Sequence, residues 1–158
     1  MSIDIDGLDI SGCTIDGVDV SEITIDGVSV WMSWDGMIYS GSDDETVKQI
    51  NASDGIVGWT FTGHSGHVYA VAVSPDSNYV YSGGYDDTVK QINASNGSAG
   101  WTFTGHSKYV LAVAVSPDSN YVYSGSYDET VKQINVSNGS AGWTFTGHSD
   151  HVITVAVK

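Results

Sequence analysis

The chain has 158 residues and a formal net charge of −14 at pH 7, with 19 acidic residues against five basic ones. A surface of this sign repels phosphate backbones and anionic lipids, so we expect neither a nucleic-acid nor a membrane partner. A single cysteine excludes an intrachain disulfide, and the sequence shows neither a secretory leader nor an apolar run of about 18 residues. The 19 glycines, nine tyrosines and two prolines favour an all-β protein with tight turns.

Residues 1–33 form a segment with a ten-residue rhythm of Asp-Gly dipeptides, at Asp6-Gly7, Asp16-Gly17 and Asp26-Gly27. Asp-Gly between alternating apolar residues is a strong hairpin signal, so we expect a β-hairpin-rich segment. So short a segment cannot cover its own apolar face, which should pack on the rest of the chain or on its copies. The stretch EITIDGVSVWM resembles the small β-rich openings of bacteriophage virion and tail proteins.

The rest of the chain, residues 34–158, is built from a 42-residue repeat. WTFTGHS begins at Trp59, Trp101 and Trp143, and TVKQIN begins at Thr46, Thr88 and Thr130. Residues 59–100 and 101–142 are identical at 36 of 42 positions. A repeat of this length indicates a structural unit that buries its apolar surface against its neighbours.

Each unit contains four runs that favour β-strands, separated by turn residues. In the unit that begins at Gly63 these runs are HVYAVAV, YVYSGG, TVKQINA and AGWTFTG. The first run is apolar on both faces, which is typical of a strand buried on two sides. Pro75 favours one turn, and Asn96-Gly97 favours a hairpin turn before the last strand. Four antiparallel strands every 42 residues predict a propeller blade.

The repeat resembles the WD-repeat (WD40-like) family over residues 34–158. The resemblance rests on YSG in the second strand, on the pairs Gly63-His64, Gly105-His106 and Gly147-His148, and on an Asp-x-Thr-Val turn at Asp44, Asp86 and Asp128. It implies a hydrogen bond between the histidine and the turn aspartate of one blade, which pairs His64 with Asp86 and His106 with Asp128. The family's Trp-Asp is replaced by Ile50-Asn51, Ile92-Asn93 and Ile134-Asn135, so we expect an apolar pocket there.

The strand count divides this part of the chain into four pieces. Residues 34–62 supply the second to fourth strands of one blade, residues 63–104 and 105–146 supply two whole blades, and residues 147–158 supply one first strand. Because three blades are too few for a ring, we expect an all-β, three-blade unit that closes by oligomerisation and shares a blade between chains.

In such a ring the last strand of one chain completes the first blade of the next, and His148 pairs with Asp44 of that neighbour. The residues expected in this clasp are Val152, Ile153, Thr154, Val155, Ala156 and Val157 against Met37, Ile38 and Tyr39. A homotrimer gives nine blades, which the small inner-strand residues Ala70, Ala72, Ala112 and Ala114 favour. A homodimer gives six blades, within the usual range of about four to eight.

Two further groups of residues allow more than one interpretation. Trp59, Trp101 and Trp143 in the outer strands, with Tyr85 and Tyr127 in blade turns, either bind a sugar or a partner on the rim or pack between blades. The histidines recur in one context, which favours a structural role, and the carboxylates of Asp4-x-Asp6 and SDDE are typical of turns rather than of calcium loops. We therefore expect no catalytic, metal or cofactor site.

The sequence thus predicts a non-enzymatic, self-assembling structural and interaction propeller whose main partner is itself. The resemblance of residues 1–33 favours a phage virion or tail-associated component, with other virion proteins as partners. Its location would be the virion or the cytoplasm of a prokaryotic host. The alternatives are a carbohydrate-binding or host-surface adhesin and an engineered repeat protein.

Overall fold

The computed structural model describes residues 4–5, 8–9, 22–25, 28–31 and 36–158, which fall into two compact units, Met1–Asp35 and Gly36–Lys158. In the first unit β1(Asp4–Ile5) pairs with β2(Leu8–Asp9), and β3(Glu22–Ile25) pairs with β4(Val28–Trp31), both antiparallel. Each pair flanks one of the Asp-Gly dipeptides expected to form a hairpin. The third dipeptide, Asp16-Gly17, and the packing expected for residues 1–33 lie outside what the structure describes.

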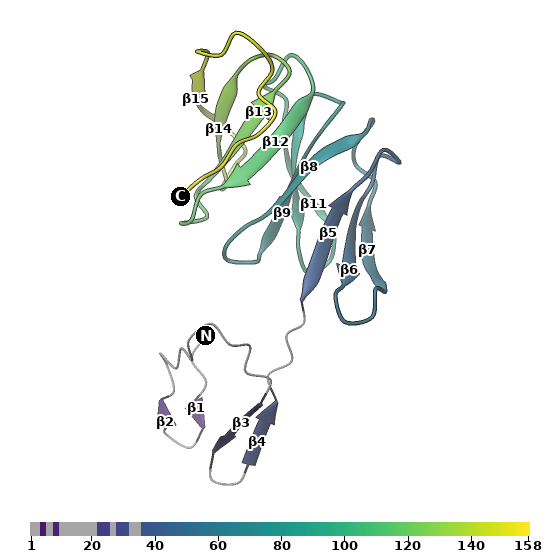
Figure 1. Ribbon diagram of the computed structural model, residues 1–158, viewed down its shortest axis with the longest axis vertical. Helices are drawn as coiled ribbons and strands as arrows, with labels where there is room; N and C mark the ends of the chain where they lie inside the picture. Colours follow the sequence, from purple (N-terminus) through teal and green to yellow (C-terminus); the bar gives the residue numbers. More distant parts are fainter. Residues whose placement is uncertain (1–3, 6–7, 10–21, 26–27, 32–35) are drawn as a thin grey trace. The chain divides into compact units, whose positions relative to one another are not determined.

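The second unit contains three antiparallel sheets that lie side by side (Figure 1). The first sheet consists of β5(Met37–Gly41), β6(Val47–Asn51) and β7(Val57–Phe61). The second consists of β8(Val68–Val73), β9(Tyr79–Gly84), β10(Val89–Asn93) and β11(Ala99–Phe103), and the third of β12(Val110–Val115), β13(Tyr121–Ser126), β14(Val131–Asn135) and β15(Ala141–Phe145). Each strand pairs with the next along the chain, so the sheets have the meander order of propeller blades.

The apolar core lies between the sheets. One cluster joins Val47 and Phe61 of the first sheet to Val68, Val80, Ile92 and Ala94 of the second. The other joins Tyr81, Val89 and Phe103 of the second sheet to Val110, Val122 and Ile134 of the third. The repeat therefore produces two equivalent junctions, in which each sheet covers an apolar face of the next.

The segment 151–157 differs from its prediction as a strand, because the structure assigns it no strand. Its beginning does follow the repeat: the N–H of Val152 donates to the carbonyl of Ser126 at 3.0 Å, as that of Val68 donates to Ser42. The rest of the segment has no ladder partner within the described part of this chain. Alternating apolar residues make a strand only where a second strand takes up their backbone hydrogen bonds.

Two turn glycines allow the cost of a disturbed junction to be measured. Gly55 and Gly97 have φ of 72° and 71°, but a Cβ at Gly97 would lie 2.8 Å from Cδ2 of Trp59, whereas one at Gly55 meets nothing within 4 Å. We expect Gly55→Ala to lower the free energy of unfolding by about 1–2 kcal/mol through backbone strain alone. Gly97→Ala should lower it further, because the indole must move. Urea denaturation followed by tryptophan fluorescence checks this, and equal losses would contradict the packing argument.

Candidate functional site

The second sheet holds His64 in a closed polar network. His64 is 5% exposed, with Nδ1 2.9 Å from Asp86 Oδ2 and Nε2 2.7 Å from the hydroxyl of Ser82. Because a carboxylate can only accept, His64 donates from Nδ1, and its Nε2 accepts from Ser82. The hydroxyl of Thr88 donates to the other oxygen of Asp86 at 2.7 Å. When the imidazole is neutral, each of these side chains therefore has a hydrogen-bond partner within the network.

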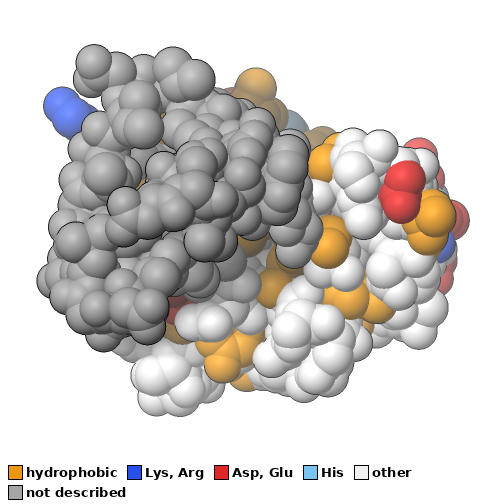
Figure 2. Space-filling view, turned by 90° about the horizontal axis from the view of Figure 1, so that it is seen from below, with side chains coloured by type: hydrophobic (Ala, Val, Ile, Leu, Met, Phe, Trp, Pro, Cys, Tyr) orange, Lys and Arg blue, Asp and Glu red, His pale blue; other side chains and the backbone are white. Residues whose placement is uncertain are grey.

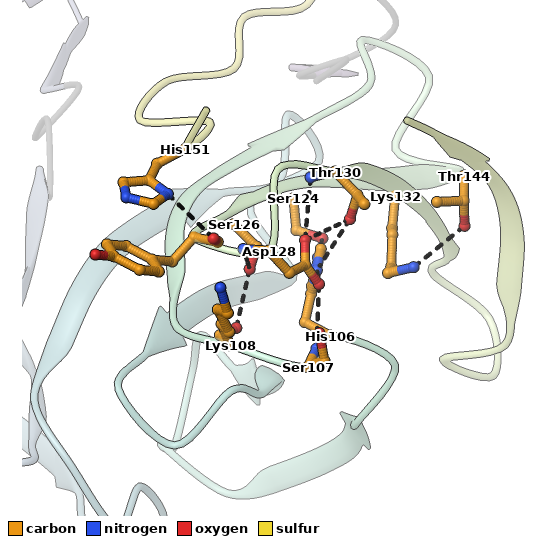
Figure 3. Close-up of polar contacts among 11 residues, drawn as sticks. His106, Ser107, Lys108, Ser124, Ser126, Asp128, Thr130, Lys132, Thr144 and His151 are labelled. Carbon is orange, nitrogen blue, oxygen red and sulfur yellow. Dashed lines mark hydrogen bonds and ion pairs between the residues drawn. The ribbon is translucent and has the colours of Figure 1, made fainter. Parts of the chain in front are cut away.

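The third sheet repeats the network around His106 (Figure 3). His106 Nδ1 lies 2.8 Å from Asp128 Oδ2, and its Nε2 lies 2.7 Å from the hydroxyl of Ser124. Burial lowers the pKa of His106 below its ordinary value, although Asp128 opposes this change, and burial likewise lowers the pKa of His64. Burial raises the pKa of Asp128, but hydrogen bonds from Thr130 and His106 outweigh it and bring that pKa down to about 2.

The first sheet contains the aspartate and serine of this network without a histidine from the described part of the chain. Asp44 accepts from the hydroxyl of Thr46 at 2.6 Å, as Asp86 does from Thr88. His148 lies two repeats after His64, but it is exposed, and its neighbour is Phe145 of the third sheet. The pairing expected between His148 and Asp44 therefore does not form within one chain and stays a prediction about two copies.

The position of the family's tryptophan is occupied by isoleucine, as the sequence indicates. Ile92 and Ile134 are fully buried and belong to the two apolar clusters. Ile50, at the same position in the first sheet, is only half-buried. The first sheet thus has the same side chain at a less covered site.

Each junction also carries a polar contact from one sheet to a backbone carbonyl of the next. Trp59 Nε1 donates to the carbonyl of Ala94 at 3.0 Å, and Trp101 Nε1 donates to that of Val136 at 2.8 Å. Packing between blades therefore accounts for these two tryptophans. Gln91 Nε2 also donates to the carbonyl of Val136, at 3.2 Å. Our sequence reasoning missed this glutamine, although its recurrence in every TVKQIN run is a signal of a buried polar role.

A row of aromatic rings runs across the turns at one end of the sheets. Ring centroids lie 5.7 Å apart for His67 and Tyr85, 4.1 Å for Tyr85 and Tyr109, 5.7 Å for Tyr109 and Tyr127, and 3.3 Å for Tyr127 and His151. The hydroxyl of Tyr85 raises the pKa of Tyr109 to about 12. Tyr85 and Tyr127 are 45% and 38% exposed, so a rim-binding role for these two stays a hypothesis.

The outer face of the third sheet is uncovered at positions that are buried elsewhere. Phe145 is 48% exposed, whereas its repeat equivalents Phe61 and Phe103 are 7% and 6% exposed. Trp143 is 50% exposed, and the neighbouring carbonyl that accepts from Trp59 or Trp101 has no counterpart for it among the described residues.

The opposite face, on the first sheet, is uncovered in the same way. Ile38 is 51% exposed, whereas its equivalents Val80 and Val122 are fully buried, and Met37 is 40% exposed. Figure 2 shows hydrophobic side chains at the surface of the described part of the chain. These two faces are the candidate interaction site, and we call them the incoming face (Met37, Ile38 and Tyr39) and the outgoing face (Trp143, Phe145 and residues 147–157).

Residues 36–158 and the described strands before them contain neither a metal site nor a membrane-spanning helix. No group of three or more His, Cys, Asp or Glu side chains there could hold a metal ion. No helix in that part of the chain is long and apolar enough to cross a membrane.

Three meander sheets lie side by side, and two of them contain a histidine–aspartate–serine network. These features define blades of a WD-type propeller, and comparison with known proteins agrees. The profile of the family described as WD domain, G-beta repeat matches residues 55–93 and 97–135. The chain therefore belongs to the WD40-repeat β-propeller family. No match is found among curated protein sequences.

Two solved structures illustrate the likeness. One is described as the structure of U3-55K, with a TM-score of 0.72 and 30% identity over 75% of this chain. The other is described as the crystal structure of RRP9 WD40 repeats, with the same TM-score, identity and coverage of this chain. The matched part spans only 38% and 37% of those two chains.

Removing one member of the buried network should destabilise the folded chain. Ser82→Ala leaves Nε2 of His64 buried without a donor, so we expect the free energy of unfolding to fall by about 1–3 kcal/mol. Ser98→Ala, at an exposed position in the turn before β11, should change it by less than about 0.5 kcal/mol. Urea denaturation of the two variants at pH 7.5 gives the comparison, and equal effects would show that the network contributes nothing.

The same network predicts how stability depends on pH. Because folding lowers the pKa of His64 and His106, their contribution is fully present above about pH 6.5, the ordinary value, and is lost as the pH falls below it. The pKa values of Asp86 and Asp128 are also lowered, which adds a second loss below about pH 4. The free energy of unfolding, measured between pH 7.5 and 5, should therefore decrease. A constant or rising value would contradict neutral, buried histidines.

Proposed function

We propose that this chain is a protein-interaction scaffold that assembles with copies of itself into a closed propeller ring. In this ring the outgoing face of one copy covers the incoming face of the next. The observation that carries the proposal is the repeat itself: Phe145 and Ile38, which are exposed on the two faces, have equivalents in the same chain that a neighbouring sheet buries. A pair of faces that already fit each other twice within one chain is expected to fit between two chains.

The register of this contact follows from the pairing of β8 with β9. There Val68, Ala70, Val71, Ala72 and Val73 lie opposite Gly84, Gly83, Ser82, Tyr81 and Val80. Shifted by the repeat, Val152, Thr154, Val155, Ala156 and Val157 of one copy would lie opposite Ser42, Gly41, Ser40, Tyr39 and Ile38 of the next. Residues 151–157 would then become the missing inner strand of a four-stranded sheet, by β-strand addition to β5.

The polar contacts of the interior junctions would recur in the proposed one. His148 would lie between Asp44 and Ser40 of the neighbouring copy, as His64 does in the second sheet. Trp143 Nε1 would donate to the carbonyl of Ala52 of that copy, the equivalent of Ala94. The contact therefore satisfies polar groups as well as covering apolar ones, which distinguishes it from unspecific association.

Three copies would give nine blades and two would give six. The inner strands carry small side chains: Ala112 is 7% exposed, and Ala70, Ala72 and Ala114 are half-buried. These small residues support a wide ring and hence the trimer. The usual range of about four to eight blades supports the dimer instead. The mass of the assembly in solution, by multi-angle light scattering or native mass spectrometry, decides between them.

For the biological role we propose a phage virion or tail-associated component that presents this ring. The support is the resemblance of residues 1–33 to β-rich openings of virion proteins, in a segment that contains the antiparallel strand pairs β1–β2 and β3–β4. A carbohydrate-binding adhesin would use the exposed rings of Tyr85 and Tyr127, and binding on a glycan array would favour it.

The incoming face can be tested without disturbing the fold. Ile38→Asn changes a residue that is 51% exposed in the single chain but fully buried in the proposed assembly. Burying an isoleucine contributes about 2 kcal/mol, so the association constant should fall about thirtyfold or more while the circular dichroism stays unchanged.

Ile153→Asn is the matched control. Ile153 is 73% exposed, and its equivalent Tyr69 remains 42% exposed inside an interior junction, so this variant should assemble like the unchanged protein. A chain that is monomeric at every concentration, or an Ile38→Asn variant that assembles normally, would refute the proposed contact.

A further inference from the structure

His148 lies outside the network that its two repeat equivalents form. His64 and His106 are 5% and 6% exposed, each held between a carboxylate and a serine hydroxyl. His148 is exposed. Phe145 lies edge-on to it with ring centroids 5.4 Å apart, as Phe103 does to His106 at 6.1 Å. The ring is therefore already near its place in a junction, and the groups that would bind it are missing.

We infer that closing the junction between two copies releases the proton that His148 carries in acid, so that assembly weakens as the pH falls. This inference rests on the proposed strand addition between copies. In that junction His148 occupies, between Asp44 and Ser40 of the neighbouring copy, the place that His64 occupies in the second sheet. The exposed ring of the single chain and the buried ring of the assembly thus differ in how well they hold a proton.

The hydrogen bonds at the two ring nitrogens explain why the junction binds the neutral imidazole. At His64, Nδ1–H donates to the carboxylate and the lone pair of Nε2 accepts from the serine hydroxyl. A second proton would remove that acceptor and place a charge in a buried site. Burial lowers the pKa of both His64 and His106, even beside a carboxylate. An exposed imidazole, by contrast, ordinarily takes up a proton near pH 6.5.

Other charged groups would face His148 in the assembly, and most have counterparts in the chain. From β6 of the neighbour, Lys48 opposes a second positive charge, as Lys90 opposes one at His64. From its own third sheet, Glu129 holds the position from which Asp87 raises the pKa of His106. The surroundings of His106 include a lysine and a carboxylate at these places, and burial still lowers the pKa of His106. These two charges therefore do not reverse the preference of the junction for a neutral ring.

A second pair of histidines, His67 and His151, would lie at the exposed edge of the junction. Acid would make these two strengthen the assembly instead of weakening it. His151 of one copy would approach Asp43 of the next, and Asp43 already lies 3.7 Å from His67. In acid these imidazoles would gain attraction to Asp43. The side chains of His67 and Asp43 are 48% and 82% exposed, however, and Asp150 beside His151 is 84% exposed. Exposed ion pairs contribute little, so the buried His148 sets the sign.

The test is the association constant of the whole chain at pH 8.0 and pH 5.5, from the concentration dependence of its mass by light scattering. An exposed imidazole is about ten parts protonated to one at pH 5.5, so each junction should weaken about tenfold. His148→Gln has no titrating group at this position, so it should not show the tenfold weakening at pH 5.5. Circular dichroism at both values ensures that the chain itself stays folded.

The control variant is His67→Tyr with His151→Tyr, which restores the tyrosine found at Tyr109. It should keep the tenfold pH dependence. Equal association of the unchanged chain at both pH values, or loss of the dependence in this double variant, would overturn the inference while leaving the assembly intact. A chain that is monomeric at pH 8.0 as well would instead refute the proposed function on which the inference rests.

A second measurement covers the case in which His148→Gln fails to assemble. Dilution of the unchanged assembly in a calorimeter at pH 6.0, in two buffers of different ionisation enthalpy, gives the number of protons exchanged. Proton uptake on dissociation supports the inference, and zero or release overturns it.

Discussion

The contact between neighbouring sheets is the interaction on which the rest of this structure depends. Each sheet is apolar on both faces, and both buried clusters lie between sheets rather than within one. A three- or four-stranded sheet with two bare apolar faces is not stable in water, so every sheet needs a neighbouring sheet. The junction is therefore the unit of stability, and the strands, turns and networks serve to form it.

The polar groups make this junction specific. The histidine, aspartate and serine of one sheet fix the loop that leads into its inner strand, since the imidazole reaches both the turn and β9 or β13. Tryptophan and glutamine side chains then donate to one carbonyl of the next sheet. Apolar faces alone could slide past each other, whereas a buried donor without its acceptor is costly, so these bonds select one register.

The repeat also explains which apolar side chains are exposed at the two ends of the row of sheets. Phe145 and Ile38 are exposed for the same reason that Phe61 and Val80 are buried: the presence or absence of a neighbouring sheet. The partner that we propose for both faces is another copy of this chain. A histidine that is neutral inside a junction and exposed outside it would make such recognition sensitive to protons, with no residue added for the purpose.

The sequence by itself determined the strands, the turns, the 42-residue repeat and the His64–Asp86 and His106–Asp128 spacing, because these depend on local periodicity and on residues one repeat apart. Only the tertiary structure decided which side chains a neighbour covers. Residues 151–157 have the pattern of a strand but no ladder partner in the described chain. Phe61 and Phe145 both follow Trp-Thr in the sequence, but Phe61 is 7% exposed and Phe145 is 48% exposed. Gln91 and the aromatic row from His67 to His151 likewise acquired their roles from the adjacent sheet. Whether a side chain is buried depends on the neighbouring sheet, and the sequence of one repeat does not say whether that sheet is present.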